Sequence, residues 1–395
     1  MQLVAYGAQD IYLTGNPQIT FFKVVYRRHT NFSMESIQQT WAGTFDGTTG
    51  KGRCTATIAR NGDLVSRLYV ELENEFGKSA GHHSNLGAQW IDTVECEIGG
   101  QTIDRQYGHW MEAWAELTEP NPSGFSGSTQ GGAQGTNFQV MSQMGGNVEG
   151  TKPADGIMMI PLRFWFCENP GLALPLIALQ YHEVKIILNS KGDIHSMNKS
   201  GDPKLWADYI YLDTDERRRF AQVSHEYLIT QIQYQNFSSD NKTCTLTFNH
   251  PVKELVWTGE WVSGDKTHAG TFTGLDENAK YQLKLNGHDR FAARGRNYFT
   301  MSQVWQYHTG FGSYDHTSSH VNGQAIAVYS FALKPEEHQP SGTCNFSRID
   351  NAQLVTTNST NAASSGDSIR PNNIYAVNYN VLRIMSGMGG LAYSN

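Results

Sequence analysis

The glycine-rich string Gly77-Lys-Ser-Ala-Gly81 has the residue types of two reactive loops, a nucleophile elbow and a phosphate-binding loop. A nucleophile elbow needs a helix directly after its serine, whereas the polar run GHHSNLG follows here. A phosphate loop needs a glycine where Leu72 stands. The adjacent His82 and His83 lack spaced acidic or cysteine partners for a metal. We therefore interpret this segment as a polar loop tip that holds no metal.

Two further strings place glutamate directly after histidine, His182-Glu183 and His225-Glu226. Neither has a second histidine four residues after the first, so the spacing of a zinc protease is absent. Neighbouring residues on a strand point to opposite faces, and His182 and Glu183 therefore cannot form an acid–base pair. Because no pattern combines a nucleophile, a base and oxyanion donors, we expect no catalytic residue, no cofactor and no enzyme activity.

Near the end of the sequence, Gly387-x-Gly389-x-x-Ala392 resembles a dinucleotide-binding fingerprint. That fingerprint must open a βαβ unit, and only three residues follow it in the sequence. We interpret it as a flexible tail in close backbone contact with the rest of the protein.

The composition of the 395 residues favours a β protein. The chain has 39 glycines, 11% aromatic residues and only 17% charged residues, which is typical of many short strands joined by turns. Its net charge of −7 argues against direct nucleic-acid binding, since a nucleic-acid coat needs excess lysine and arginine. Five widely spaced cysteines without a C-x-x-C pair indicate neither a disulfide framework nor a zinc finger, and three of them lie in strand-like runs as expected core residues.

The sequence shows no targeting or membrane-spanning segment. Its start lacks the charged region and long apolar stretch of a signal peptide, and no run of about 18 apolar residues could span a bilayer. We expect a protein that is made and folds in a reducing cytosol.

Strand patterns fill both halves of the chain. The first half has them at 32–44, 54–60, 64–73, 90–98, 157–167, 171–188 and 205–213, and the second at 227–234, 244–249, 254–261, 281–285, 325–333, 348–356 and 374–384. Apolar residues at helical spacing predict helices at 104–117, which would bury two tryptophans, and at 297–307. Residues 119–155 read as a long exposed loop, and the charged stretch 213–222 as a surface turn and domain boundary.

The two halves repeat one plan. Val94–Gln101 and Tyr281–His288 are each a strand closed by an x-Gly turn before a helix, and Leu176–Lys185 matches Phe346–Val355. About eight strands per half suit two consecutive antiparallel jelly rolls, an all-β fold with short helices in its long loops. We expect an N-terminal arm at 1–26, a first jelly roll at 27–215 and a second at 216–395.

Four segments resemble the major capsid proteins of nucleocytoplasmic large DNA viruses, and most of all their algal-virus (phycodnavirus) branch. They are Gly7–Ser33, Gly171–Lys185, Pro340–Leu354 and Asn378–Tyr393. The resemblance implies a double jelly roll of which three copies form a pseudo-hexagonal capsomer, and it implies capsomers that tile an icosahedral shell around an internal membrane. It places the protein in the virion, after synthesis and assembly in the host cytoplasm.

The resemblance also implies partners and sites. The expected partners are two further copies in a homotrimer, neighbouring capsomers, and minor capsid and penton proteins. The inner arm would use Tyr6, Gly7, Asp10, Tyr12, Asn16 and Pro17 for assembly. Among six N-x-S/T strings, Asn236, Asn241 and Asn358 are the candidate glycosylation sites.

A carbohydrate-binding or hydrolytic β-sandwich is the alternative, because jelly rolls also host lectins. Trp257 and Trp261 lie four residues apart on a strand-like run, so they would share one face and could stack on sugars. The same spacing equally suits a protein core.

Overall fold

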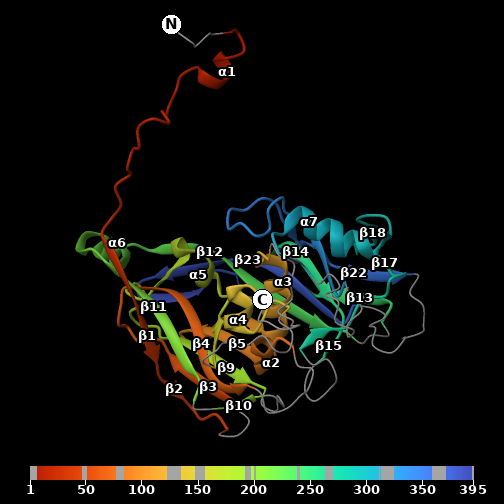
Figure 1. Cartoon of the computed structure of the whole chain (residues 1–395), viewed down its shortest axis with the longest axis horizontal. Helices are drawn as coiled ribbons and strands as arrows, with labels where there is room; N and C mark the ends of the chain where they lie inside the picture. Colours follow the sequence, from red (N-terminus) through yellow and green to blue (C-terminus); the bar gives the residue numbers. More distant parts are fainter. Residues whose placement is uncertain are drawn as a thin grey trace.

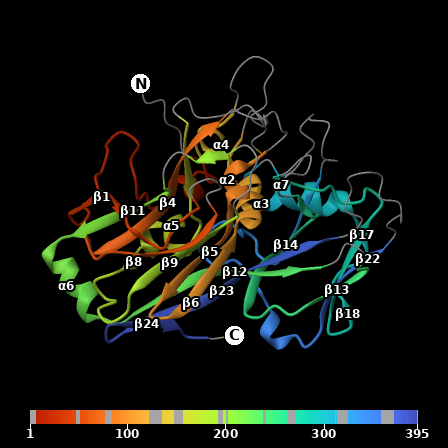
Figure 2. The same cartoon turned by 90° about the horizontal axis from the view of Figure 1, so that it is seen from below.

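Two β-rich lobes lie side by side and are joined edge to edge (Figure 2). The computed structural model describes residues 7–46, 51–76, 84–121, 135–146, 156–191, 197–199, 202–237, 241–262, 270–310, 312, 324–357 and 371–393. Within these residues, no helix is both long and apolar enough to cross a lipid bilayer.

The first lobe consists of two antiparallel sheets. One has the order β1-β11-β4-β10, with β7 and β8 also paired to β4, and the other has the order β2-β3-β9-β5-β6. Their strands are β1 (Phe32–Gln39), β2 (Trp41–Ala42), β3 (Gly52–Thr57), β4 (Leu64–Phe76), β5 (Ile91–Ile98), β6 (Gln101–Tyr107), β7 (Ile157–Pro161), β8 (Leu174–Pro175), β9 (Val184–Ser190), β10 (Met197–Lys199) and β11 (Lys204–Leu212).

The second lobe repeats this plan. One sheet has the order β12-β23-β14-β20, with β21 paired to β14 and β24 to β23, and the other has the order β13-β22-β17-β18, with β19 paired to β17; β15 and β16 form a short ribbon. Their strands are β12 (His225–Asn236), β13 (Thr243–Leu246), β14 (Pro251–Thr258), β15 (Trp261–Val262), β16 (Thr271–Phe272), β17 (Lys280–Leu285), β18 (His288–Asp289), β19 (Arg294–Gly295), β20 (Ile326–Ser330), β21 (Cys344–Asn345), β22 (Ala352–Thr357), β23 (Asn373–Met385) and β24 (Met388–Leu391).

Strand order and turn geometry confirm the predicted repeat. β11 lies between β1 and β4 as β23 lies between β12 and β14, and the pairings β11–β4 and β23–β14 each contain one register shift. The two hairpins turn through Gly99-Gly100 and Asn286-Gly287, and all four residues have positive φ. Such turns match the twist of the flanking strands. The predicted all-β double jelly roll is therefore confirmed.

The core of each lobe lies mainly between its own two sheets, although Ile229 of β12 and Leu382 and Ile384 of β23 also join the first-lobe cluster. In the first lobe, alternate residues of β3 and β5 point inward, so Cys54, Ala56 and Val94 meet Leu68 and Val70 of β4 in one buried cluster. Cys244 lies in the corresponding cluster of the second lobe. Burying one such aliphatic side chain contributes about 1.5–3 kcal/mol. The prediction that three strand cysteines are core residues is confirmed for Cys54, Cys96 and Cys244.

The segment 157–188 is less continuous than its apolar content indicates. β7 ends at Pro161, and the helix α5 (Trp165–Glu168) replaces the rest of the predicted strand. A 3₁₀ turn, η1 (Pro170–Leu172), and the two-residue β8 then precede the buried strand β9. Proline at three places lacks the N–H that a continuous strand donates, which explains the interruptions.

Four other predicted elements need correction. The helix predicted at 104–117 begins at Gly108, as α3 (Gly108–Thr118), because residues 104–107 complete the hairpin strand β6. The predicted loop 119–155 contains α4 (Asn137–Ser142), which Thr136 and Gln139 cap reciprocally. The charged stretch is the exposed helix α6 (Thr214–Gln222) rather than a turn, and the supposed flexible tail is β24, paired to β23.

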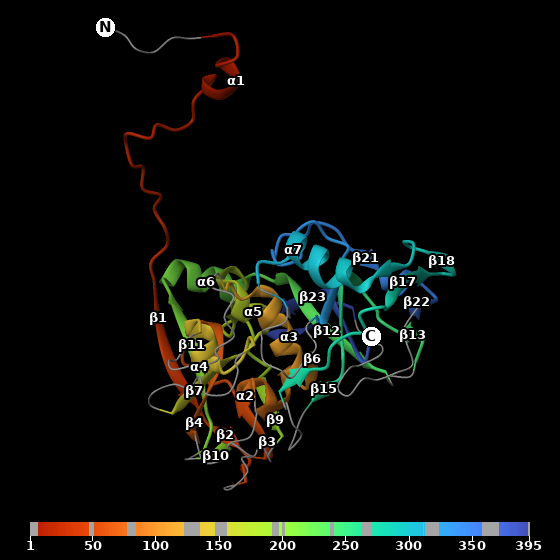
Figure 3. The same cartoon turned by 45° about the vertical axis from the view of Figure 1, so that its right-hand side comes forward.

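The helix predicted at 297–307 is confirmed. It consists of a π-helical turn, η2 (Tyr298–Ser302), followed by α7 (Gln303–Tyr307). This helix lies on the surface of the second lobe (Figure 3).

The turn after β5 offers a matched pair of glycine substitutions. A Cβ on Gly99 would lie 2.3 Å from His182 Nδ1, whereas a Cβ on Gly100 meets nothing within 4 Å, although both residues have positive φ. Gly99→Ala should therefore lower the free energy of unfolding by roughly 1–3 kcal/mol more than Gly100→Ala. Denaturant unfolding of both variants measures the difference, and equal losses would contradict this packing.

Candidate assembly surfaces

The N-terminal arm leaves the body of the protein ahead of β1 and extends away from it (Figure 1). It contains one short helix, α1 (Ile11–Thr14), and Oδ2 of the preceding Asp10 accepts a hydrogen bond from Gly7 N at 2.6 Å. Asn16 has a φ of 56° directly before Pro17 and ends the helical region. Of the residues assigned to assembly, Gly7, Asp10, Tyr12, Asn16 and Pro17 lie on this arm, and Tyr6 lies outside the described residues.

Large apolar side chains cover the arm. Ile11, Tyr12, Leu13, Ile19, Phe21, Phe22, Val24, Val25 and Tyr26 are all at least 69% exposed. Lys23 lies on the arm and Arg27 and Arg28 follow it directly, so this region is positively charged against the single Asp10, whereas the whole chain carries −7. A contiguous exposed apolar segment of this kind marks an interaction site.

The junction between the lobes is built on α3. This helix belongs to the first lobe, but Trp110 and Trp114 on one face of it pack against the outer face of the β12-β23-β14-β20 sheet of the second. The Trp110 ring lies 5.0 Å from the Tyr375 ring and 5.4 Å from the Trp114 ring. The prediction that this helix buries two tryptophans is confirmed. That they are buried against the other lobe was not foreseen.

A second contact joins the strand edges of the two lobes. Gln231 Nε2 on β12 donates to the Ile103 carbonyl on β6, and Ile232 N donates to Asp104 Oδ1 at 3.3 Å. Burial raises the pKa of Asp104 to about 7. The nearby His109 contacts the Tyr375 hydroxyl, and burial lowers the pKa of His109 to about 3, so this imidazole is neutral.

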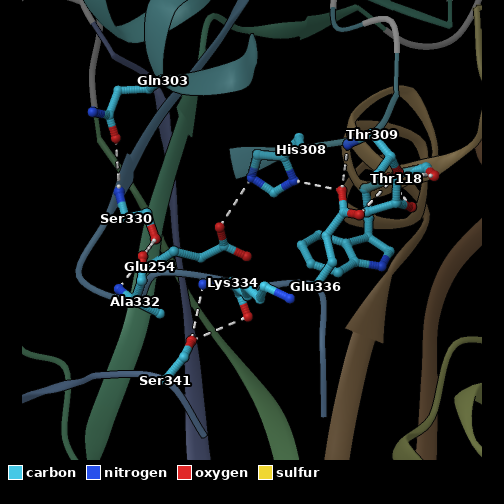
Figure 4. Close-up of polar contacts among 11 residues, drawn as sticks. Thr118, Glu254, Gln303, His308, Thr309, Ser330, Ala332, Lys334, Glu336 and Ser341 are labelled. Atoms are coloured by element: carbon cyan, nitrogen blue, oxygen red, sulfur yellow. Dashed lines mark hydrogen bonds and ion pairs between the residues drawn. The ribbon is translucent and has the colours of Figure 1, made fainter. Parts of the chain in front are cut away.

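His308, which follows α7, forms the polar centre of the junction (Figure 4). Its Nε2 lies 3.0 Å from Glu254 Oε2 on β14, and its Nδ1 lies 3.0 Å from Glu336 Oε1. The side chains of His308 and Glu254 are fully buried. A neutral imidazole carries only one N–H, so two carboxylate partners require the imidazolium form.

The pKa of His308 agrees with this geometry. Burial alone would lower that pKa, but the charges and hydrogen bonds of Glu254 and Glu336 outweigh burial and raise it to about 9. The same contacts lower the pKa of Glu336. A buried imidazolium held by two carboxylates has no free lone pair, so this cluster cannot act as a general base.

Hydrogen bonds of Thr309 and Gly310, the two residues after His308, connect the cluster to α3. Thr309 donates through N to Glu336 Oε1 at 2.9 Å and through its hydroxyl to the Thr118 carbonyl at 3.1 Å (Figure 4). Gly310 N donates to the Leu117 carbonyl at 2.7 Å. The end of α3 is therefore fixed to the second lobe by both apolar and polar contacts.

The sequence analysis did not predict the pair of buried carboxyls on α3, Glu112 and Glu116. Glu112 accepts hydrogen bonds from Gly145 N at 2.9 Å and Gly146 N at 2.7 Å, and burial raises its pKa to about 7. Burial and the nearby Glu112 raise the pKa of Glu116 as well. Their spacing of four on a predicted helix was the available signal, but their burial depends on the loop that covers them.

The other candidate residues do not converge on a reactive site. His182 Nδ1 contacts the Gly389 backbone oxygen at 3.0 Å, which is a framework contact. Gly77–Gly81, His82 and His83 lie outside the described residues, and among the described ones no group of three His, Cys, Asp or Glu side chains could hold a metal ion.

The structural basis offered for sugar binding is wrong. Trp257 is 1% exposed and packs on Tyr281 and Phe299 inside the second lobe, whereas Trp261 lies on β15 against Phe272. The chain bends at Gly259 between β14 and β15, so the two tryptophans do not share a free face.

Of the three glycosylation candidates, two can be placed. Asn236 and Asn241 are exposed, and Asn358 lies outside the described residues. Asn236 Nδ2 donates to Asn372 Oδ1 at 2.8 Å and to Asn373 Oδ1 at 3.0 Å.

Comparisons with known proteins agree with the fold. Residues 216–390 match the family model described as large eukaryotic DNA virus major capsid protein, and residues 20–213 match the model of the major capsid protein N-terminus. The major capsid protein of Pyramimonas orientalis virus is 50% identical over 100% of this chain and 99% of its own length. That of Paramecium bursaria Chlorella virus 1 is 41% identical with the same coverage.

Solved structures give the same result. A quasi-atomic model of the PBCV-1 virus capsid has a TM-score of 0.76 at 35% identity and covers 95% of this chain and 100% of that one. The Faustovirus major capsid protein, at 14% identity, shares the fold with a TM-score of 0.63. The strand order and the similar solved structures together define a double jelly-roll capsid protein.

The chain belongs to the major capsid proteins of large eukaryotic DNA viruses, and it is similar to phycodnavirus members of that family. It is a structural component of the virion capsid and not an enzyme. Because its role is structural, the surfaces relevant to its function are those available for contact with other capsid components.

The junction should weaken in alkali. The pKa of His308 is about 9 in the folded protein against 6.5 ordinarily, so its stabilisation is complete below pH 6.5 and is lost as the pH rises through 9. The shift corresponds to roughly 3 kcal/mol. Thermal unfolding from pH 6 to 10 should show this loss in the native protein and not in His308→Gln. The exposed His288→Gln serves as the control and should keep the native pH profile.

Proposed function

We propose that three copies of this chain form a pseudo-hexagonal capsomer, and that these capsomers tile the icosahedral shell of a large DNA virus. The observation that carries the proposal is the repeat of one strand order in two lobes of a single chain. Two similar lobes per chain let a trimer present six near-equivalent sides, which is what hexagonal packing needs.

The proposed division of labour within the chain follows its segments. Residues 27–215 and 216–395 form the two jelly rolls of the wall, and residues 1–26 form the arm. The arm lies on the inner side of the shell, near an internal membrane, where its exposed apolar and basic side chains meet minor capsid proteins. Neighbouring capsomers and penton proteins complete the shell, which assembles in the host cytoplasm without direct nucleic-acid contact by this protein.

If the outer surface is glycosylated, Asn241 is the better acceptor of the two placed candidates. Both side chains are exposed, but the amide of Asn236 is already engaged by Asn372 and Asn373. Glycopeptide mass spectrometry of virions reads out the modification at both positions and at Asn358.

The purified protein should be a trimer at micromolar concentration. Light scattering should give three times the 44.1 kDa mass of one chain, because the lobes expose sheet edges and apolar side chains that a further copy covers. A monomer over the whole concentration range would contradict the capsomer.

Removing residues 1–25 should separate folding from shell formation. No residue of α1 is buried, so the shortened chain should keep the unfolding midpoint and trimeric mass of the full chain. Shell formation with the other capsid components, followed by electron microscopy, should be impaired. Loss of folding would show that the arm belongs to the body instead.

A further inference from the structure

α3 covers one row of residues on the second lobe, and the equivalent row on the first lobe has no such helix over it in a single chain. On the second lobe, α3 covers a cross-strand row in which Val256 of β14 pairs with Tyr375 of β23 on one side and Val328 of β20 on the other. Val256 and Tyr375 are 0% exposed. This row is where the first lobe binds.

The register of the strands locates the same row on the first lobe. In the pairing of β23 with β14, the register shifts at Val377, and Tyr375 lies two residues before that point. In the pairing of β11 with β4, the register shifts at Asp208, and Trp206 lies two residues before that point. The equivalent row is therefore Trp206 of β11, Tyr69 of β4 and Pro161 of β7.

This first-lobe row is aromatic and partly open. Tyr69 and Trp206 are half-buried and their rings stack at 6.3 Å and 12°. The indole N–H of Trp206 has no hydrogen-bond partner among the described residues. Tyr69 and Pro161 also line an open depression of about 520 Å³. The edge strand β1, at one side of the molecule in Figure 2, is exposed over most of its length, whereas β6 covers its counterpart β12.

The helix equivalent to α3 also has a free face. α7 follows the hairpin β17–β18 as α3 follows the hairpin β5–β6. Phe299 and Val304 point into the protein, while Met301 is 36% and Trp305 is 82% exposed. Met301 and Trp305 are four residues apart, as are Trp110 and Trp114. Large exposed tryptophans of this kind dominate the binding energy of protein interfaces.

We propose that the helix formed by η2 and α7 of one copy docks, through Met301 of η2 and Trp305 of α7, on Tyr69 and Trp206 of a second copy. The contact repeats between chains what α3 does within a chain, so the second copy is the occupant that the fold itself specifies. Such an interface is head-to-tail. Contacts within and between chains then alternate around a ring, which closes at three chains and six lobes. The inference rests on the proposed trimer and names the residues that hold it together.

Mass photometry of the full chain tests the contact. Trp305→Ala and Trp206→Ala should each raise the dissociation constant of the trimer at least about tenfold, as loss of an interface tryptophan does. Tyr181→Ala, a control at a residue 75% exposed on another part of the surface, should leave the trimer unchanged. Because Trp305 is 82% exposed, its substitution should leave the fold of the single chain intact, which far-UV circular dichroism checks. An unchanged trimer in Trp305→Ala overturns the proposal.

A cross-link tests the partner surface directly. A photoreactive benzoylphenylalanine at position 305 should join to peptides that contain Tyr69 or Trp206, and only between chains, which isotope-labelled mixtures reveal by mass spectrometry. Cross-links to other segments in a protein that is still a trimer would overturn the docking and leave the capsomer intact. A native chain, with Trp305 in place, that stays monomeric would overturn both.

Discussion

The structure depends above all on the burial of one helix against a lobe to which it does not belong. Trp110 and Trp114 project from α3, and the second lobe provides the apolar sheet face that covers them. Exposing two tryptophans costs several kcal/mol, so the lobes are held in one relative position even though each has its own core. A fixed relation between two similar lobes is what the proposed trimer, with its six near-equivalent sides, requires.

Charge reinforces this apolar contact at its edge. Burying an imidazolium and two carboxylates would be unfavourable for any of the three groups alone. Both ring nitrogens of His308 lie 3.0 Å from a carboxylate oxygen, so each ring N–H has an acceptor. These two hydrogen bonds fix the position of the imidazolium relative to Glu254 and Glu336. The polar cluster therefore fixes the geometry of the junction, and it contributes to stability as long as His308 is protonated.

The same physics explains the surfaces that the chain leaves uncovered. Trp305 is 82% exposed, and the N-terminal arm carries nine large apolar side chains that are each at least 69% exposed. Monomeric proteins seldom expose a contiguous apolar segment such as this arm. These features belong to a structural capsid protein, and in the described part of the chain Asp104, Glu112 and His308 lie in packed junctions between elements. The faces that the chain leaves exposed are the surfaces available for contact with other capsid components.

The sequence by itself determined much of the architecture. Alternating apolar residues, x-Gly turns and the order of elements predicted two similar antiparallel halves, because these signals are local to each strand and hairpin. Helical spacing likewise identified Trp110 and Trp114 as buried. The start of α3 was misplaced because the strand pairing of residues 104–107 with β5 outweighs their local pattern.

Only the tertiary structure decided what covers what. His308, Glu254 and Glu336 are separated by up to 82 positions and share no motif, so their convergence depends on how β14, α7 and the segment after β20 pack. In the same way, Trp305 and Trp110 both follow a hairpin on a helix, yet one is exposed and the other buried. Periodicity states that a face is apolar, but which surface meets it is a property of the folded lobes.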